Sequence, residues 1–484
     1  MSRWGTHPVK RLPSCLLTYV LLVLAASPTA AAQSDHALTL DGSWQTEEVE
    51  LTDGRILRGL VEEEQGQRLQ FLEMRRRAGR PTMLVTHSLA RDEIVHLKRL
   101  ADDARGVLRE RLEAVRNRAA IEATRAQNVT LQPRDLDGIR FWSHAGPWFQ
   151  IEAALEPSEL RRIVVRLEQV FRAFDQVLPP ADGEVPQSTT PISFVVFGDH
   201  RQYAAYLRRE GIPIRNPAYF DPARRQVVVS SDLARLLDVA RAVEDEHLSQ
   251  LRDLYPDDKV IAEALAERDR RLDEGGYSDA ERRRLLFLTR VRWRTDENAV
   301  VKQIRRIERR NRDAVQAERE DLERRLFHEA FHAYADGRLA APAGHPLPRW
   351  LSEGLAQIFE SPLFDADLLR IDAPDPQRLA RLQADLASHP PLTLSELLSA
   401  DQSRFLVPHD ASGRTSERHY LYAWSVAYYL VFEHPRLTRG RLTEYAVASD
   451  SAEIAAFEEL VGLPLADFEA KWRERMSRLT SGDR

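Results

Sequence analysis

Short apolar runs separated by turn residues occupy the first part of the chain and predict β-strands. The runs Val49–Thr52 and Ile56–Val61 flank Asp53-Gly54, a pair that favours the tight turn of a β-hairpin. Two more runs of this kind follow at Leu69–Leu72 and Met83–Thr86. We therefore predict a small antiparallel β domain over residues 37–98, with a docking or spacer role because it holds no cluster of catalytic residue types.

The spacing of apolar residues then changes to that of helices. Between Leu100 and Arg125 apolar residues recur at helical intervals amid charges, which predicts a connecting helix in a linker over residues 99–135. Beyond Pro133, strand and helix patterns alternate, as in a mixed α+β fold. The expected strands are 138–142, 148–151, 192–197 and 226–230, and the expected helices are 158–177 and 200–210.

A long, heavily charged segment follows and predicts a helical insertion over about 232–320. From Glu281 to Arg325 there are 15 Arg or Lys and 9 Asp or Glu, a net charge of +6 (15 − 9). The apolar stripe of Val300, Ile304 and Ile307 is lost at Asn311. Opposite charges one turn apart are typical of a solvated helix, and their interleaving argues against nucleic-acid binding. A helical cap over a cleft and a partner-binding arm remain alternatives.

The candidate chemistry begins at His328-Glu329-Ala330-Phe331-His332. Residues four apart lie on one face of a helix, so the two imidazoles can bind one metal ion. Glu329 follows its histidine by about 100° around the helix. That position suits a base acting on metal-bound water rather than a direct ligand.

A second segment, Pro348–Glu360, supplies the third candidate ligand. The Gly and Pro residues between the two segments end one helix and open a loop, so that a second helix can return beside the first. Its Gly354 allows close approach of backbones, and Glu353 is the candidate ligand. Two histidines and a carboxylate leave one position open for water, which is the arrangement of a catalytic zinc site.

The two segments resemble the active-site helix and the third-ligand helix of the gluzincin metallopeptidases, the superfamily of thermolysin and the zinc aminopeptidases. The Trp350–Ala356 stretch is especially similar to a peptidase-like domain of unknown function in exported bacterial proteins. The resemblance implies Zn²⁺ at His328, His332 and Glu353, with Glu329 as general base and acid. It also implies a gluzincin-like domain over 136–480, with a mixed sheet, the HExxH helix and a helical C-terminal lobe.

Three further expectations come from the same comparison. The position that holds an orienting aspartate in thermolysin-like enzymes is Gln357 here, and Asp336 is a candidate substitute. The strand Gln226–Ser230 is the candidate edge strand for extended substrate, with an interior strand as the alternative. Similar enzymes also use a tyrosine or histidine to stabilise the oxyanion. The aromatic segment Arg418–Leu430 offers Tyr420 first, then Tyr422 or His419, unless these rings only fill the core.

The first 32 residues have the plan of a secretory signal. Positive charges precede an apolar run from Cys15 to Ala26, and small residues end at Ala32, the expected cleavage point. The run is too short for a permanent membrane span, so we expect an exported, periplasmic or secreted protein. Cys15 is the only cysteine, so the mature chain would have no disulfide. The net charge of −6 gives no general case for nucleic acid or an anionic membrane as partner.

The sequence thus predicts an exported zinc metallopeptidase that acts on peptide or protein substrates. Zinc would lower the pKa of its bound water toward about 7, and Glu329 would take the proton. Two alternatives stay open. One is a zinc hydrolase of a non-peptide bond, and the other is a non-catalytic envelope scaffold with a relic site. In either case a protein partner could bind through the β domain or the helical insertion.

Overall fold

The computed structural model describes most of the chain after residue 43. The described residues are 44–136, 138–179, 191–254, 258–365, 368–371, 373–388, 390–405, 413–434, 437–448 and 453–480. They belong to one compact unit, Ala37–Arg484. The expected signal segment, its cleavage point at Ala32 and Cys15 lie outside the described residues. Among the helices that are described, none combines the length and the apolar character needed to cross a bilayer.

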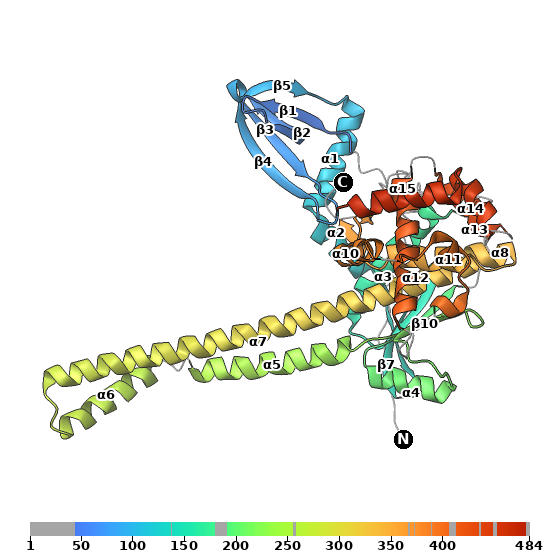
Figure 1. The fold of residues 1–484 in the computed structure, drawn as a ribbon. Helices are drawn as coiled ribbons and strands as arrows, with labels where there is room; N and C mark the ends of the chain where they lie inside the picture. Colours follow the sequence, from blue (N-terminus) through green and yellow to red (C-terminus); the bar gives the residue numbers. More distant parts are fainter. Residues whose placement is uncertain are drawn as a thin grey trace, which may run out of the picture. The chain divides into compact units, whose positions relative to one another are not determined.

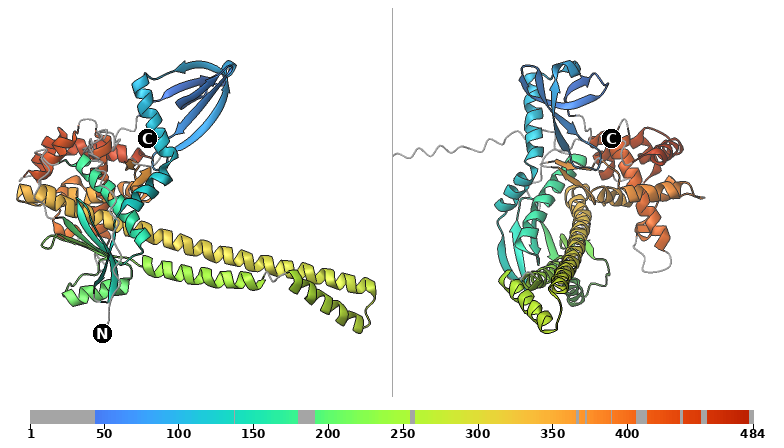
Figure 2. Two further views of the ribbon diagram at one scale, coloured as in Figure 1. Left: turned by 180° about the vertical axis from the view of Figure 1, so that it is seen from behind. Right: turned by 90° about the vertical axis from the view of Figure 1, so that its left-hand side faces the viewer.

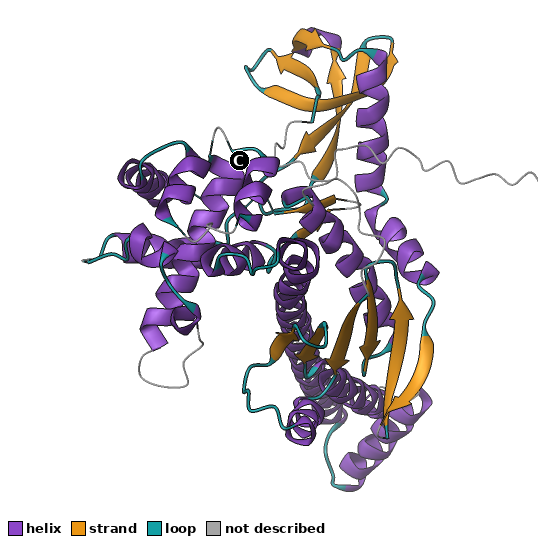
Figure 3. Cartoon of the chain, turned by 90° about the vertical axis from the view of Figure 1, so that its right-hand side faces the viewer, coloured by secondary structure: helices purple, strands orange, loops and turns teal. Residues whose placement is uncertain are grey.

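The α+β class predicted from the sequence is confirmed, and Figure 3 shows the strands gathered in separate sheets among many helices. The N-terminal strands form an antiparallel sheet in the order β4-β3-β2-β1-β5. One face buries its own apolar cluster, and the other packs against α1 through Leu108, Leu112 and Val115. The strands are β1 (Glu47–Leu51), β2 (Ile56–Gln65), β3 (Arg68–Arg75), β4 (Met83–Ala90) and β5 (Ile94–Lys98), with a 3-10 turn at Arg91–Glu93.

The predicted connecting helix is two helices rather than one. They are α1 (Asp102–Arg116) and α2 (Arg118–Asn128), separated at Asn117, whose φ of −99° and ψ of 12° leave the helical region. Asparagine favours such breaks because its side chain competes with the helical hydrogen bonds of the backbone.

A six-stranded sheet supports the C-terminal half of the chain, in the order β10-β11-β9-β8-β7-β6. Alternate residues of β9 point to opposite faces, as the period of two demands. Phe194 and Val196 pack on the side of α3 and α7, whereas Val195 and Phe197 pack with α4. The elements are β6 (Gln132–Leu136), β7 (Ile139–Ala145), β8 (Phe149–Ala153), α3 (Pro157–Val177), β9 (Ile192–Phe197), α4 (His200–Glu210), β10 (Ala218–Asp221) and β11 (Gln226–Ser230).

The edge strand differs from the expected one. Gln226–Ser230 is β11, which pairs with β10 on one side and with β9 on the other, so it is an interior strand. The edge is β10, which runs antiparallel to β11. Strand order within a sheet depends on pairing between distant segments, and the alternation of apolar residues does not reveal it.

The charged insertion consists of long helices that pack side by side (Figures 1 and 2). They are α5 (Leu233–Leu254), α6 (Asp258–Glu274) and α7 (Asp279–Ala335). The histidines of the motif lie at the end of α7, so one helix of 57 residues includes both the insertion and the metal-binding motif. Ile304 is buried and the His247 ring contacts Glu308, and these contacts help to hold α7 against α5.

The last turns of α7 are fixed in the core from two sides. Apolar residues at helical spacing, including Leu326, Phe327 and Phe331, are buried in the largest hydrophobic cluster. On a neighbouring face, Glu323 accepts hydrogen bonds from Arg162 (2.6 Å) and Arg166 of α3. A partly buried carboxylate held by two guanidinium groups restrains the rotation of the helix. The direction in which the histidines point is therefore fixed by packing.

Past α7, the chain forms a helical C-terminal region. A π-helical turn (Asp336–Ala340) and α8 (Ala341–Ala343) lead to α9, which contains the second segment of the predicted site. The remaining elements are α9 (Arg349–Ile358), β12 (Leu363–Asp365), β13 (Leu368–Arg370), α10 (Pro376–Leu386), α11 (Leu394–Leu398), a 3-10 turn (Gln402–Phe405), α12 (Gly413–Tyr428), a π turn (Tyr429–Glu433), α13 (Arg439–Val447), α14 (Ile454–Val461) and α15 (Leu465–Arg478).

A buried polar cluster joins the N-terminal β domain to the hairpin of β12 and β13. Asp365 accepts hydrogen bonds from the backbone N–H (3.1 Å) and the hydroxyl of Thr82, in the loop between β3 and β4. Arg370 lies 3.2 Å from Asp365 and donates to the carbonyl oxygens of Arg77 and Arg80, each at 2.9 Å. Asp365 and Arg370 are both buried, so each of their hydrogen bonds replaces one to water. We call the contacts of Thr82, Asp365 and Arg370 the latch.

Gly354 permits α9 and α12 to touch, as the sequence predicted. A Cβ added at Gly354 would lie 2.3 Å from the carbonyl oxygen of Ala423 and 2.8 Å from the Cβ of Ala427. Since the obstacle is helix backbone, Gly354→Ala is expected to lower the free energy of unfolding by at least about 2 kcal/mol. Urea titration measures this loss. Gly440→Ala is the control, since its new Cβ meets open space and stability should be equal or slightly higher.

Candidate metal centre

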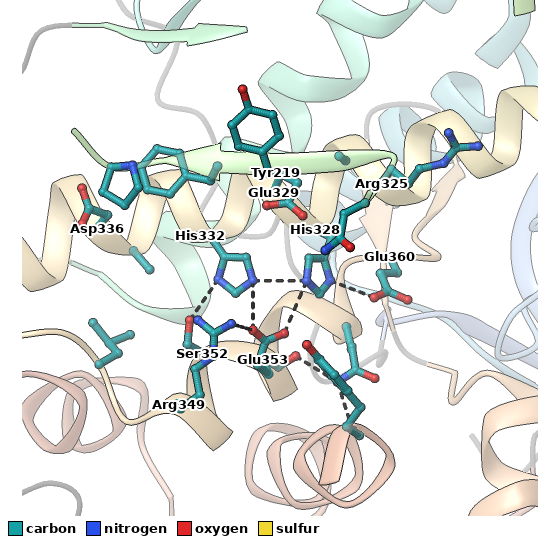
Figure 4. A pocket seen from close by; sticks show the side chains of 18 of the residues that line it. Tyr219, Arg325, His328, Glu329, His332, Asp336, Arg349, Ser352, Glu353 and Glu360 are labelled. Carbon is teal, nitrogen blue, oxygen red and sulfur yellow. Dashed lines mark hydrogen bonds and ion pairs between the residues drawn. The ribbon is translucent and has the colours of Figure 1, made fainter. Parts of the chain in front are cut away.

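His328 and His332 present their rings to the same space at the end of α7. Their Nε2 atoms are 3.1 Å apart, and the ring planes are inclined by 76°. Figure 4 shows the two imidazoles side by side, one helical turn apart. Histidines four residues apart thus share one face of the helix, as helix geometry predicts.

Glu353 approaches the same point from α9. Its Oε2 lies 3.4 Å from Nε2 of His328, and its Oε1 lies 3.6 Å from Nε2 of His332. Among the described residues, these three offer nitrogen and oxygen atoms that all lie within 4.8 Å of one another. The carboxylate is only 1% exposed, so the charge sits inside the protein rather than in solvent.

These distances fit a zinc ion. Ligands about 2.0 to 2.2 Å from a tetrahedral Zn²⁺ are about 3.3 to 3.6 Å from each other. The 3.1 Å between the two Nε2 atoms and the 3.4 Å between Nε2 of His328 and Oε2 of Glu353 are close to this range. Oε2 of Glu353 is moreover buried without a hydrogen-bond partner. A buried carboxylate oxygen with no donor is costly unless a cation satisfies it. His328, His332 and Glu353 are therefore the residues that would hold the metal.

The Nδ1 atoms of both histidines have their own partners. Nδ1 of His328 is 2.8 Å from Oε1 of Glu360, and Nδ1 of His332 is 3.1 Å from the hydroxyl oxygen of Ser352. Glu360 is held in turn by Arg378, whose Nη2 donates to its other oxygen at 2.6 Å. Such partners fix the ring orientation and leave each Nε2 free for a metal.

The two residues considered from the sequence for this orienting role do not perform it. The Gln357 amide donates to the backbone carbonyls of Glu353 (3.1 Å) and Tyr420 (3.0 Å), not to an imidazole. Asp336 lies beyond His332, on the side away from Glu360 (Figure 4). Glu360 lies just past the end of α9 at Ile358, where helical spacing no longer gives the direction of a side chain, so the sequence carried no signal for this contact.

The electrostatics favour positive charge between the rings. Burial alone would lower the pKa of His328, but Glu353 and Glu360 outweigh it and raise this pKa well above its usual value. Burial alone would raise the pKa of Glu353, but His332 and His328 outweigh it and hold this pKa well below its usual range. Carboxylates that stay ionised and stabilise a cationic ring would equally stabilise a divalent cation at that point.

Glu329 lies beside the metal-ligand atoms without being one of them. Figure 4 shows its carboxylate next to Tyr219, across the two imidazoles from Glu353. No hydrogen bond or ion pair engages Glu329 within the described part of the chain, so its oxygens are available to a water or substrate proton. Its predicted position, close to the metal but outside the ligand set, is thus the one that it occupies.

Tyr420 also borders the site, but its hydroxyl has a partner. It donates to the carbonyl oxygen of Phe405, while burial and then the negative charge of Glu353 raise the pKa of the phenol. The group therefore stays protonated and remains a donor. Of the alternatives, Tyr422 is fully buried and donates to Asp385 (2.7 Å), and His419 is buried as well. Tyr420 is thus the only one of the three that lines the cleft.

A cleft of about 890 Å³ is lined by the three candidate ligands together with Glu329, Glu360 and Tyr420. One wall is β10 with the loop before it, and the opposite wall is α9. Arg349 enters from α9, and its Nη2 lies 2.6 Å from Oε1 of Glu353, leaving the unpartnered Oε2 as the oxygen for a metal. The cleft is large enough for several residues of an extended peptide.

The comparison with known protein families covers this part of the chain. Residues 325–439 match the family described as Protein of unknown function (DUF1570). The match begins just before His328 and includes Glu353, Glu360 and Tyr420. No curated protein and no solved structure is significantly similar to the chain. The matched region, residues 325–439, thus contains the three candidate metal ligands.

Within the DUF1570 region, Glu360 can be tested as the orienting partner of His328. Glu360→Ala is expected to weaken zinc affinity by about 10- to 100-fold, because the ring loses the acceptor that holds its Nδ1. Competition with a chromogenic chelator measures the affinity. Gln357→Ala is the matched comparison and should leave affinity nearly unchanged, since its amide reaches only backbone. A larger effect at Gln357 than at Glu360 would contradict the assignment.

Proposed function

We propose that this protein is an exported zinc metallopeptidase that hydrolyses peptide bonds. The observation that carries the proposal is the convergence of His328, His332 and Glu353 at zinc-ligand separations, with the unengaged carboxylate of Glu329 beside them. A histidine pair, one carboxylate ligand and one adjacent base form the minimum set for metal-assisted hydrolysis.

Bound zinc would supply Lewis-acid polarisation and would lower the pKa of water in its open position. Glu329 accepts the proton of the attacking water and returns it to the leaving amine. Glu360 and Ser352 keep the imidazoles turned so that both Nε2 atoms face the cleft. Arg349 holds one oxygen of Glu353, so that the carboxylate offers its other oxygen to the metal.

The oxyanion role of Tyr420 requires a movement. Its single O–H proton is donated to Phe405, so the hydroxyl must release that carbonyl before it can donate to substrate. The ring lies in the cleft already, and the raised pKa keeps the proton in place. The proposal therefore assigns Tyr420 a donor role in the substrate complex, coupled to rearrangement around Phe405.

A peptide substrate is favoured over other substrates by β10. This edge strand pairs with β11 on one side only, and its residues Ala218–Phe220 line the cleft. The unpaired side of an edge strand offers alternating N–H and C=O groups, which an extended peptide can match. The strand thus takes over the substrate-binding role that the sequence suggested for Gln226–Ser230.

The main argument for a relic site does not hold in this structure. That alternative rested on Gln357 in the place of a charged orienting residue, whereas the charged partner of His328 is Glu360. A hydrolase of a non-peptide bond would use the same residues, so only its substrate distinguishes it from a peptidase.

One experiment tests both the relic-site alternative and the non-peptide alternative. The purified chain should contain about one zinc per molecule. It should also cleave members of a mixed peptide library, and metal-loaded protein without any cleavage would count against a peptidase.

A further inference from the structure

The outer side of α7 near its start combines exposed apolar side chains with unpaired arginines. Phe287, Leu288 and Val291 are 64%, 48% and 44% exposed. We call these three residues, together with the exposed arginines between positions 283 and 294, the basic face of α7. Its arginines are Arg283, Arg284, Arg290, Arg292 and Arg294.

The arrangement around the helix is that of an amphipathic surface. At 100° per residue, Phe287, Leu288 and Val291 fall together on one side, with Arg284 between them and the other four arginines flanking them on both sides. The opposite side is turned inward: Leu285 and Leu286 are half-buried, and Arg282 pairs with Asp269 of α6 at 3.1 Å. The exposed apolar residues are therefore not part of the packing between α6 and α7.

The positive charge of this face is not neutralised within the protein. None of its five arginines forms an ion pair or a side-chain hydrogen bond with any residue that the structure describes. No acidic residue occurs between positions 283 and 294. Arginines of α6 behave differently, since Arg270 and Arg271 both pair with Glu267. An ordinary solvated helix balances its charges as α6 does, through opposite charges one turn apart.

We propose that the basic face of α7 binds the surface of an anionic lipid bilayer. Apolar residues flanked by arginines suit the boundary between headgroups and acyl chains, where the guanidinium groups meet lipid phosphates and the apolar groups leave water. The face is an exposed helix surface, and its positive charge is complementary to an extended anionic plane. Binding would be peripheral and is independent of the zinc site.

Vesicle cosedimentation tests this binding with the chain that begins at Gln33, which keeps every residue described here. The chain should sediment with vesicles of equal phosphatidylglycerol and phosphatidylcholine, less so as salt rises, and not with pure phosphatidylcholine. Arg283→Gln, Arg284→Gln and Arg290→Gln together should weaken partitioning on the order of 100-fold. Serine at positions 287, 288 and 291 in place of the apolar residues should weaken it about tenfold or more.

The control removes the same charge from another helix. Arg268→Gln, Arg270→Gln and Arg271→Gln in α6 should leave partitioning close to that of the unaltered chain, because those arginines have no exposed apolar cluster beside them. Circular dichroism verifies that each variant is folded. Equal loss in the control, or no sedimentation by the unaltered chain, would overturn the proposal. A change in oligomeric mass of the face variants without vesicle binding would assign the face to contact between copies instead.

Discussion

Glu329→Gln is expected to reduce kcat/KM for peptide hydrolysis by about 10²- to 10⁴-fold while one zinc stays bound. Glutamine keeps the shape of the side chain but cannot accept the proton of the attacking water. The three ligand side chains are untouched, so metal content should equal that of the unaltered chain. Peptide cleavage followed by mass spectrometry, together with zinc analysis of the same samples, measures both quantities.

Glu320→Gln is the control for this loss, because Glu320 lies on the same helix, is exposed and bonds only to Gln316. That variant should retain full activity. A Glu329→Gln protein that still cleaves peptides at the original rate would remove Glu329 from the mechanism. Loss of both zinc and activity would instead make Glu329 a ligand.

His332→Ala is expected to weaken zinc binding on the order of 10³-fold or more, because it removes one of three protein donors. The remaining pair, His328 and Glu353, would fill only two of the four positions of a tetrahedral zinc site. Dialysis against a chelator followed by metal analysis distinguishes the variant from the unaltered chain. Hydrolysis should fall with the metal and should not return at zinc concentrations that restore chelator-treated unaltered protein.

His96→Ala serves as the control, since His96 is an exposed residue of β5. It should bind zinc as the unaltered chain does. Zinc retained at full affinity by His332→Ala would show that the convergence of the three side chains is incidental. In that outcome the hydrolytic proposal would fail, whereas the proposed lipid contact on α7 would be unaffected.

The local geometry of the site was accessible from the sequence, because helix periodicity determines it. His328 and His332 share a face whatever the rest of the fold, and the Gly and Pro residues before Pro348 require the chain to return. The proximity of Glu353 to both rings also needs the packing of α9 beside α7, with which these two facts are only compatible. Gly354 is a further case, since only a residue without a side chain fits against Ala423.

The contacts between distant elements could not be predicted from the sequence. Whether Gln357 or Glu360 meets His328 depends on where α9 ends and on the position of Arg378, neither of which has a local signal. The order of β10 and β11 depends on pairing across the sheet. The continuity of α7 from the insertion into the histidine motif was not predicted, because its apolar stripe fades at Asn311. Buried residues on both sides of Asn311 accompany one continuous helix.

The latch between the β domain and the β12–β13 hairpin makes the division at residue 98 unsuitable for shortening the chain. Cutting there would take Thr82 from Asp365 and two carbonyl acceptors from Arg370, and would leave this buried charged pair with fewer hydrogen bonds. The hairpin begins three residues after Glu360, so the disturbance would start next to the support of His328. The part of the chain with the candidate metal site and the β domain thus depend on each other's buried contacts, although the sequence presents them as two modules.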